Sequence, residues 1–234
     1  MARSTAAAAK RRKPNPTERR RDLCDAAIQL LADDGAKGLS PVSYTHLDVY
    51  KRQAMCFPLH KFSDIRYNYA LAGGATMDAG CYAVHMARTF GGGTPEVVSA
   101  QAKLRDPQVD RAMTAELLFA EGHTGRVRCS MWSSDLLRIS AKVVGEHGEL
   151  RVLNPVLPQM FHRLSVRSAD GKRVERFSRR PTYAYQLDAF AAAVLRGEPV
   201  KTTPADAIEN MTVICLLYTS LQPNDVERDR KSVV

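Results

Sequence analysis

The stretch VVSAQAKL at residues 97–104 alternates apolar and polar side chains, and this alternation decides the fold class. A period of two is that of a β-strand with one face covered and the other open. The period returns at residues 113–119, 127–131, 139–143, 150–152, 164–166 and 174–177. Short turns join these runs, with Asp170-Gly171 the strongest hairpin signal. The sequence therefore predicts a mostly antiparallel, open-faced sheet.

Helical patterns bracket the predicted strands. One helix is expected over residues 76–90, ending at Gly91, and another over residues 183–196, ending at Gly197. A third begins at Thr203-Pro204, where a capping hydroxyl precedes a proline at the first helical position. Strands in series flanked by helices indicate an α+β domain.

The helix after Gly73-Gly74 carries the clearest group of chemically active side chains. Asp78, Tyr82 and His85 stand at positions i, i+4 and i+7, which share one face of an α-helix. A carboxylate, a phenol and an imidazole that point the same way can donate or relay a proton. By spacing alone, the alternative of a solvated helix face stays open.

Four segments resemble the C-terminal domain of Gfo/Idh/MocA oxidoreductases, in the branch that contains glucose-fructose oxidoreductase and dihydrodiol dehydrogenase. They span about 140 residues in the order that the family would have. The segments are GGATMDAGCYAVHMARTFGGGTPEVVSA (73–100), VDRAMTAELLFAEGHTGRVRCSMW (109–132), VVGEHGELRVLNP (143–155) and YAYQLDAFAAAVLRGEPVKTTPADAIENMTVI (183–214).

The resemblance assigns roles to individual residues. It implies that Asp78 is the active-site aspartate and that Tyr82 exchanges a proton with the substrate, while His85 contacts the substrate one turn on. Gly73 and Gly74 match the turn at which the backbone approaches the ligand. Trp132, at a strand end, is a candidate for the substrate pocket, with a core or rim position as the alternative.

The resemblance also implies an activity. Hydride would pass between NAD or NADP and a CH–OH group of a sugar, polyol or diol. The sequence has no GxGxxG after a strand, and Gly91-Gly92-Gly93 ends a helix instead. No Glu-Lys-Pro motif appears either. We therefore expect the Rossmann domain to be missing, and this chain to bind no cofactor and to be inactive alone.

The expected domain organisation has four parts. Residues 1–40 form a basic leader with one helix, and residues 17–40 resemble the first helix of TetR-type regulators. Residues 41–55 are a junction or linker, because PVSYTHLDVYKRQ (41–53) has no helical or strand period and looks like an assembly or adapter artefact. Residues 56–214 form the substrate and dimerisation domain. Residues 215–234 are expected to be a disordered tail, and they too look like an assembly or adapter artefact.

Composition restricts the classes of partner. The net charge is +9, but residues 1–21 hold eight basic residues against Glu18, a balance of +7, which argues against a nucleic-acid surface on the main domain. No apolar run is long enough for a membrane span. The five cysteines are isolated, which favours the cytoplasm and argues against a metal site. A small-molecule substrate is expected.

A homodimer through the sheet follows from the resemblance, with residues 98–104 and 113–119 as its surface. Two alternatives stay open. A TetR-type DNA-binding regulator fragment would require a helical remainder. A non-catalytic dimerisation domain would keep the fold but leave Asp78 and Tyr82 without a role.

Overall fold

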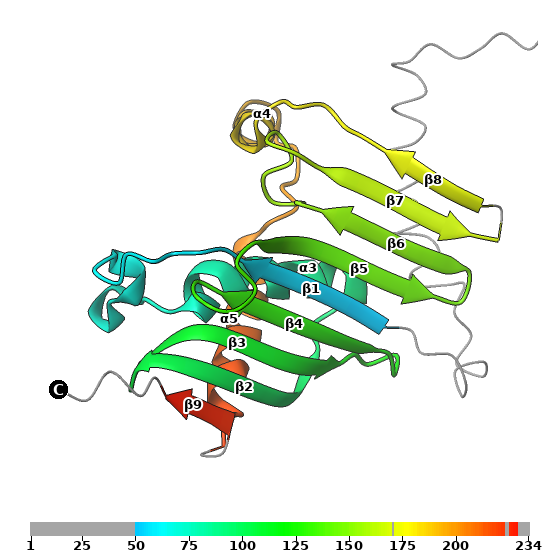
Figure 1. Ribbon diagram of the computed structural model, residues 1–234. Coiled ribbons are helices and arrows are strands. Elements are labelled where there is room, and N and C mark those ends of the chain that lie inside the picture. Colours follow the sequence, from blue (N-terminus) through cyan, green and yellow to red (C-terminus); the bar gives the residue numbers. More distant parts are fainter. Residues whose placement is uncertain (1–49, 170, 223–224, 229–234) are drawn as a thin grey trace, which may run out of the picture. The chain divides into compact units, whose positions relative to one another are not determined.

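A computed structural model describes residues 50–169, 171–222 and 225–228. The expected leader and TetR-like helix at residues 1–40, and Asp170 of the expected turn, lie outside these residues. The described part is an α+β domain built on one sheet (Figure 1). A helical remainder, which the regulator alternative requires, is wrong for this part of the chain.

The sheet has nine strands in the order β8-β7-β6-β5-β1-β4-β3-β2-β9. It is mixed, because β1 runs parallel to β4 and β2 runs parallel to β9, whereas the other neighbours are antiparallel. The strands are β1 (Tyr50–Cys56), β2 (Glu96–Asp106), β3 (Val109–Leu118), β4 (Thr124–Ser130), β5 (Arg138–Gly145), β6 (Gly148–Leu153), β7 (Arg163–Ser168), β8 (Gly171–Glu175) and β9 (Val226–Arg228). Seven of these, β2 to β8, confirm the alternating runs of the sequence.

In the part of the chain that the structure describes, three α-helices accompany the sheet, and two of them cover one of its faces. Helices α3 (Cys81–Gly91) and α5 (Pro204–Thr219) lie against that face in Figure 1. The core beneath them includes Met113, Leu117, Val127, Ile214 and Leu217, which are all buried. Thr203 caps α5 as expected, accepting a hydrogen bond from the Asp206 backbone NH at 3.2 Å.

Helix α4 (Thr182–Arg196) confirms the expected helix at residues 183–196, but its apolar stripe is not covered by the described residues. Leu187, Phe190, Val194 and Leu195 are each more than 60% exposed, and Ala192 is the buried residue of this helix. The 3.6-residue period therefore predicts the helix correctly and identifies its apolar face, without identifying what packs against it.

One residue of the opening stretch faces the other way. Ala100 and Ala102 are buried as the alternation requires, but Val98 is 64% exposed. A register shift between Val97 and Ser99 in the β2–β3 pairing reverses the alternation at this point. The covered face of β2 thus carries Ala100 and Ala102. The homodimer surface expected at residues 98–104 and 113–119 stays a prediction.

The expectation that residues 41–53 contain no strand is wrong from Tyr50 onwards. Strand β1 (Tyr50–Cys56) lies near the middle of the sheet and pairs with β4 and β5 along its full length. The strand has no apolar alternation that would predict it, because Lys51 and Gln53 are buried at positions where apolar side chains are usual. Backbone pairing on both sides defines the strand instead.

The expectation of a disordered tail at residues 215–234 is wrong for two segments. Helix α5 continues to Thr219, and Leu217 on its last turns is 1% exposed. Residues Val226–Arg228 form β9 beside β2. Burial of one face of the helix C-terminus, rather than local propensity, accounts for the extra turns.

A buried histidine lies at the β3–β4 turn. His123 is 7% exposed and its ring stacks on Phe119, with 4.6 Å between the ring centroids. The Lys51 Nζ also lies over the Phe119 ring, 5.2 Å from its centroid, and Glu121 Oε2 lies 3.6 Å from His123 Nδ1. Burial, and then the charge of Lys51, lower the pKa of His123 from 6.5 to about 4.

This lowered pKa predicts a loss of stability in mild acid. The unfolded chain takes up the His123 proton below its ordinary pKa of about 6.5, while the folded protein resists it down to about 4. The free energy of unfolding should therefore fall as the pH falls through this window, by up to about 3 kcal/mol from this group. Urea denaturation across the window measures the slope for the wild type and for His123→Asn. Equal slopes for the two proteins would contradict the assignment.

Candidate functional site

The segment that carries Asp78 is a π-helix rather than the start of a regular α-helix. Residues Thr76–Gly80 form this π-turn (η4), and α3 follows directly. Bonds of the i→i+5 type rotate the chain by less per residue than an α-helix does, so the single shared face expected for Asp78, Tyr82 and His85 is distorted at its first member.

An arginine fixes the Asp78 carboxylate. Arg66 donates from Nε to Asp78 Oδ1 at 3.1 Å and from Nη1 to Asp64 Oδ1 at 3.2 Å. Arg66 lies on the short 3-10 turn η2 (Ile65–Tyr67), which Asp64 caps. The charge of Asp78 is the main reason why the pKa of Arg66 is raised. The pair is about one-third exposed or more, so it orients the carboxylate rather than stabilising the fold strongly.

Tyr82 lies in the first turn of α3 with its side chain 48% exposed. Partial burial raises the pKa of its phenol, and the charges of Cys81, Tyr183 and Asp78 raise it further. The phenol is therefore protonated near neutral pH and able to donate a proton or a hydrogen bond. Acting as a base requires a cation or a proton acceptor beside it.

His85 turns towards helix α5 instead of completing a triad with Asp78. Its Nδ1 lies 3.6 Å from Asp206 Oδ2. The same carboxylate accepts a hydrogen bond from Arg88 Nη1 at 2.8 Å, and Arg88 also pairs with Glu209. Since Arg88 is 7% exposed, this network holds α3 against α5. The structure thus gives His85 and Asp78 different partners.

Gly73 and Gly74 form the turn before the π-helix, and neighbouring atoms of the chain leave no space for a side chain at either position. A Cβ at Gly73 would lie 2.7 Å from backbone atoms of Arg66 and Asn68. Gly74 has a φ of +136°, and a Cβ there would lie 2.5 Å from Asp110 Oδ1. Both positions therefore need glycine for folding, and an approach of ligand to this turn stays a prediction.

Trp132 follows β4 and is partly buried. Phe62 contacts it edge-on, with ring centroids 6.2 Å apart, and Arg111 Nη1 donates to its carbonyl oxygen at 2.8 Å. Phe62 also packs against Tyr67 of the segment that carries Arg66. Trp132 thus supports the loop beside the Asp78–Arg66 pair, which is compatible with the rim position considered from the sequence.

Sequence reasoning missed Asp110, a buried carboxylate at the start of β3. It is 1% exposed and accepts hydrogen bonds from the Thr76 backbone NH at 3.0 Å, from Thr76 Oγ1 at 2.7 Å and from Tyr218 OH at 2.8 Å. Burial raises its pKa. The only available signal was an acidic residue next to a buried strand residue, Val109. Asp110 fixes the N-terminus of the π-turn that carries Asp78.

The arrangement can orient a carboxylate and offer a phenolic proton from adjacent turns of the chain. The described residues contain no group of three or more His, Cys, Asp or Glu side chains placed to hold a metal ion. None of the helices in the described part is long and apolar enough to cross a membrane. An oriented carboxylate and a protonated phenol are groups that can exchange a proton with a bound ligand.

Comparison with known proteins identifies relatives of this domain. A family model described as the GFO/IDH/MocA C-terminal domain matches residues 25–151. D-xylose 1-dehydrogenase (NADP(+)) 2 of Haloferax volcanii is 32% identical over 160 residues, which are 68% of this chain and 49% of that protein. Trans-1,2-dihydrobenzene-1,2-diol dehydrogenase of Macaca fascicularis is 34% identical over 89 residues, 38% of this chain and 26% of the relative. The chain thus spans about half the length of the xylose dehydrogenase and about a quarter of the length of the dihydrodiol dehydrogenase.

Solved structures share the fold. The aldose-aldose oxidoreductase from Caulobacter crescentus, complexed with glycerol, superposes with a TM-score of 0.69 at 22% identity, covering 83% of this chain and 56% of that one. A 3-ketoreductase from Actinomadura kijaniata, in complex with NADP and TDP-benzene, superposes with a TM-score of 0.68 at 20% identity, covering 89% and 59%.

Proposed function

Because the chain belongs to the GFO/IDH/MocA family of oxidoreductases through its C-terminal domain, we propose that it supplies the substrate side of an NAD(P)-dependent dehydrogenase. The substrate would be a sugar, polyol or diol, oxidised at a CH–OH group. The observation that carries the proposal is the half-exposed Tyr82 phenol, one turn beyond an aspartate that Arg66 holds in place. The relatives' names, a xylose dehydrogenase and a dihydrodiol dehydrogenase, support this substrate class.

The turn at Gly73-Gly74 does not fit the phosphates of a dinucleotide. A pyrophosphate binds at the free N-terminus of a helix after a glycine-rich turn. Here the helix after Gly73-Gly74 begins at a position that the Asp110 carboxylate already occupies through the Thr76 NH and hydroxyl. A second anion at this point would meet a buried carboxylate. We therefore propose that NAD or NADP binds elsewhere than at this turn.

In this reaction the described residues would take part only in the transfer of the proton to or from the substrate oxygen. Tyr82 would donate its phenolic proton to the carbonyl oxygen in reduction, or accept the hydroxyl proton in oxidation. Asp78 would orient the substrate, held by Arg66 as it does so. His85 would contact the substrate through its exposed edge, at most as a binding residue.

The homodimer, the cytoplasmic location and the origin of residues 41–53 stay proposals. A homodimer through the sheet has polar side chains at its expected surface, where Ser99, Gln101 and Thr114 follow the exposed side of β2 and β3. A cytoplasmic location rests on the isolated cysteines, of which Cys56, Cys81, Cys129 and Cys215 are free thiols. The origin of residues 41–53 as a junction between two genes is testable by read coverage across that DNA.

One experiment with two arms tests the proposed function. The first arm titrates NADPH with the purified chain and measures nicotinamide fluorescence, with no binding expected at micromolar concentration. The second arm joins the half of the xylose dehydrogenase that this chain does not match to residues 50–234, which keep the whole of strand β1, and assays NADP⁺ reduction with D-xylose and related polyols. Turnover by the chimaera, with none by the chain alone, is expected. A folded chimaera that binds NADPH but turns over no sugar, polyol or diol would contradict the proposal.

A further inference from the structure

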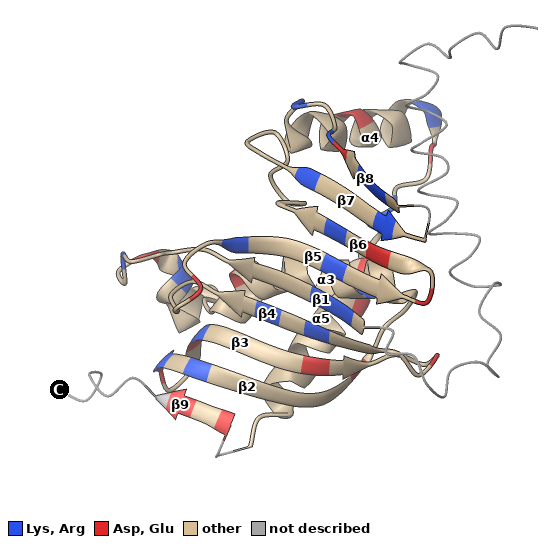
Figure 2. Ribbon diagram, turned by 45° about the vertical axis from the view of Figure 1, so that its right-hand side comes forward, with Lys and Arg blue, Asp and Glu red and all other residues tan. Residues whose placement is uncertain are grey.

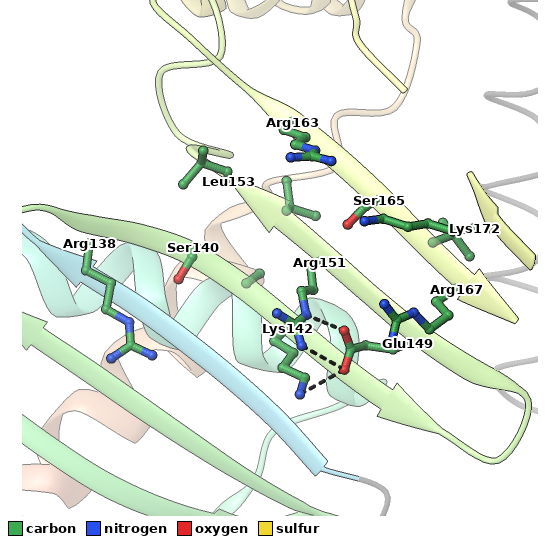
Figure 3. Close-up of a pocket in the computed structure, with 13 residues that line it drawn as sticks. Arg138, Ser140, Lys142, Glu149, Arg151, Leu153, Arg163, Ser165, Arg167 and Lys172 are labelled. Carbon is green, nitrogen blue, oxygen red and sulfur yellow. Dashed lines mark hydrogen bonds and ion pairs between the residues drawn. The ribbon is translucent and has the colours of Figure 1, made fainter. Parts of the chain in front are cut away.

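Asp110 differs from the carboxylates that form ion pairs on the strands of this sheet. Figure 2 shows basic and acidic residues on the neighbouring strands β5 and β6, and Figure 3 shows one such group, in which Glu149 pairs with Arg151 and Lys142. Hydrogen bonds from these two cations lower the pKa of Glu149 to about 2. Asp110, by contrast, is 1% exposed and accepts its hydrogen bonds from neutral donors. Pairing of surface charges therefore does not explain its place in the fold.

The carboxylate of Asp110 takes the place of a helix cap. The π-turn Thr76–Gly80 follows Ala75, which offers no side-chain cap, although the first NH groups of a helix lack acceptors within the helix. Asp110 Oδ2 accepts from the Thr76 NH at 3.0 Å and from the Thr76 hydroxyl at 2.7 Å. A cap usually comes from the residue before the helix, whereas this one comes from strand β3. The start of the π-turn is therefore fixed to the sheet.

The other end of the π-turn packs on the neighbouring strand, β4. A Cβ at Gly80 would lie 3.0 Å from the Cys129 Sγ and 3.3 Å from the Thr76 side chain. The Thr76 hydroxyl lies 3.8 Å from the same sulfur, and both Thr76 and Cys129 are buried. Glycine at position 80 therefore lets the two ends of the turn meet on Cys129. The turn is thus anchored to two paired strands, β3 and β4.

Asp78 lies midway between these two anchors. Its backbone NH donates to the Gly74 carbonyl oxygen at 3.0 Å, and its carboxylate accepts from Arg66 Nε at 3.1 Å. Its side chain is 34% exposed, so a ligand can reach it. Turns of the π type within α-helices are frequent at functional sites. Because Tyr82 follows four residues later in the continuous helix, a change in the register of the π-turn would shift Asp78 relative to both Arg66 and Tyr82.

We propose that Asp110 is a positioning residue, which acts through Thr76 to hold the π-turn in the register that places Asp78 for the reaction. The effect on catalysis rests on the proposed function, in which Tyr82 exchanges the proton. The alternative is that Asp110 only stabilises the fold. A second hydroxyl separates the two roles, because Tyr218 donates to the other carboxylate oxygen, Oδ1, at 2.8 Å and lies on α5, outside the π-turn.

The first test uses the full chain and the NMR signal of the Arg66 Nε–H group, which is assigned by its loss in Arg66→Lys. Replacing Asp110 itself would mix positioning with stability, so the test changes its donors, and urea denaturation checks that each variant is folded. Thr76→Val keeps the shape and removes the hydroxyl, and we expect it to shift the signal towards that of an unpaired arginine. Thr76→Ser should restore the wild-type signal, and Tyr218→Phe should leave it unchanged. No shift in Thr76→Val, or an equal shift in Tyr218→Phe, would overturn the proposal.

The second test measures kcat and the KM for NADP⁺ in the chimaera that carries residues 50–234. Thr76→Val should lower kcat by about tenfold, because small displacements of groups that position the substrate are costly, and should leave the KM for NADP⁺ unchanged. Thr76→Ser and Tyr218→Phe should stay within about twofold of the wild-type kcat. An unchanged kcat in Thr76→Val, or an equal loss in Tyr218→Phe, would overturn the positioning role. A wild-type chimaera without turnover contradicts the proposed function instead, and the Arg66 signal of the full chain then decides whether Asp110 holds the π-turn.

Discussion

Replacing Tyr82 by phenylalanine in the active chimaera is expected to lower kcat by about 10²-fold or more, the usual cost of removing a general acid or base. Phenylalanine keeps the ring and removes only the hydroxyl. Since the side chain is 48% exposed, packing changes little and the free energy of unfolding should stay within about 0.5 kcal/mol of the wild type. Steady-state kinetics and urea denaturation of the same preparations separate the two effects.

The pH profile identifies the role of the hydroxyl. The pKa of Tyr82 is raised above its ordinary value of about 10, so the phenolate fraction grows as the pH rises towards that value. Oxidation that uses the phenolate as a base should accelerate with pH in the wild type and lose this acceleration in Tyr82→Phe. Tyr69→Phe is the matched control, because Tyr69 is 59% exposed on the neighbouring turn η3 (Tyr69–Leu71). If Tyr82→Phe turns over as fast as Tyr69→Phe, the non-catalytic dimerisation domain is the better description.

The elements that the sequence predicted correctly are those whose period reflects burial on one face. In strands β2 to β8 and in helices α3, α4 and α5, apolar residues recur with the period of the element. They do so because each element has one apolar face, which packs on the core in most of them and is exposed among the described residues in α4. Strand β1 has no such period, since Lys51 and Gln53 are buried within it. Only the pairing partners on both sides, which are distant in the sequence, reveal it.

The candidate site was predictable as a set of residue types and not as a geometry. Asp78 and Tyr82 lie on consecutive turns as expected, but the π-turn at Thr76–Gly80 changes their relative rotation. Arg66 could not be inferred as the partner of Asp78, because the 3-10 turn that presents it has no period to detect. Asp110 was missed for a related reason: its partners Thr76 and Tyr218 are 34 and 108 residues away in the chain.

Replacing Asp110 by alanine is expected to destabilise the domain by about 3 kcal/mol or more. The substitution leaves two buried donors, the Thr76 NH and the Thr76 hydroxyl, and the part-buried Tyr218 hydroxyl without an acceptor, and each buried loss costs about 1–3 kcal/mol. Asp110→Asn keeps the volume and one acceptor oxygen, so its loss should be smaller. Urea denaturation followed by the fluorescence of Trp132, the single tryptophan, measures both.

The pH dependence distinguishes a buried carboxyl from a simple packing defect. Burial raises the folded-state pKa of Asp110 above its unfolded value of about 3.9, so its contribution is fully present below that pH and is lost as the pH rises through the folded-state pKa. The wild type should therefore exceed Asp110→Asn in stability most clearly near pH 4, and the difference should shrink towards neutrality. A constant difference would show that the carboxyl does not titrate with a raised pKa.

Tyr218 connects this prediction to the end of α5, where the sequence indicated disorder. If the last turn of α5 packs as described, Tyr218→Phe should lose about 1 kcal/mol, because it removes one of the three hydrogen bonds to Asp110. In the Asp110→Ala background, the same change should cost almost nothing, since the acceptor is already gone. Additive losses in this double-mutant cycle would mean that the two side chains do not interact, and the residues from Cys215 onwards would then revert to the tail that their sequence suggests.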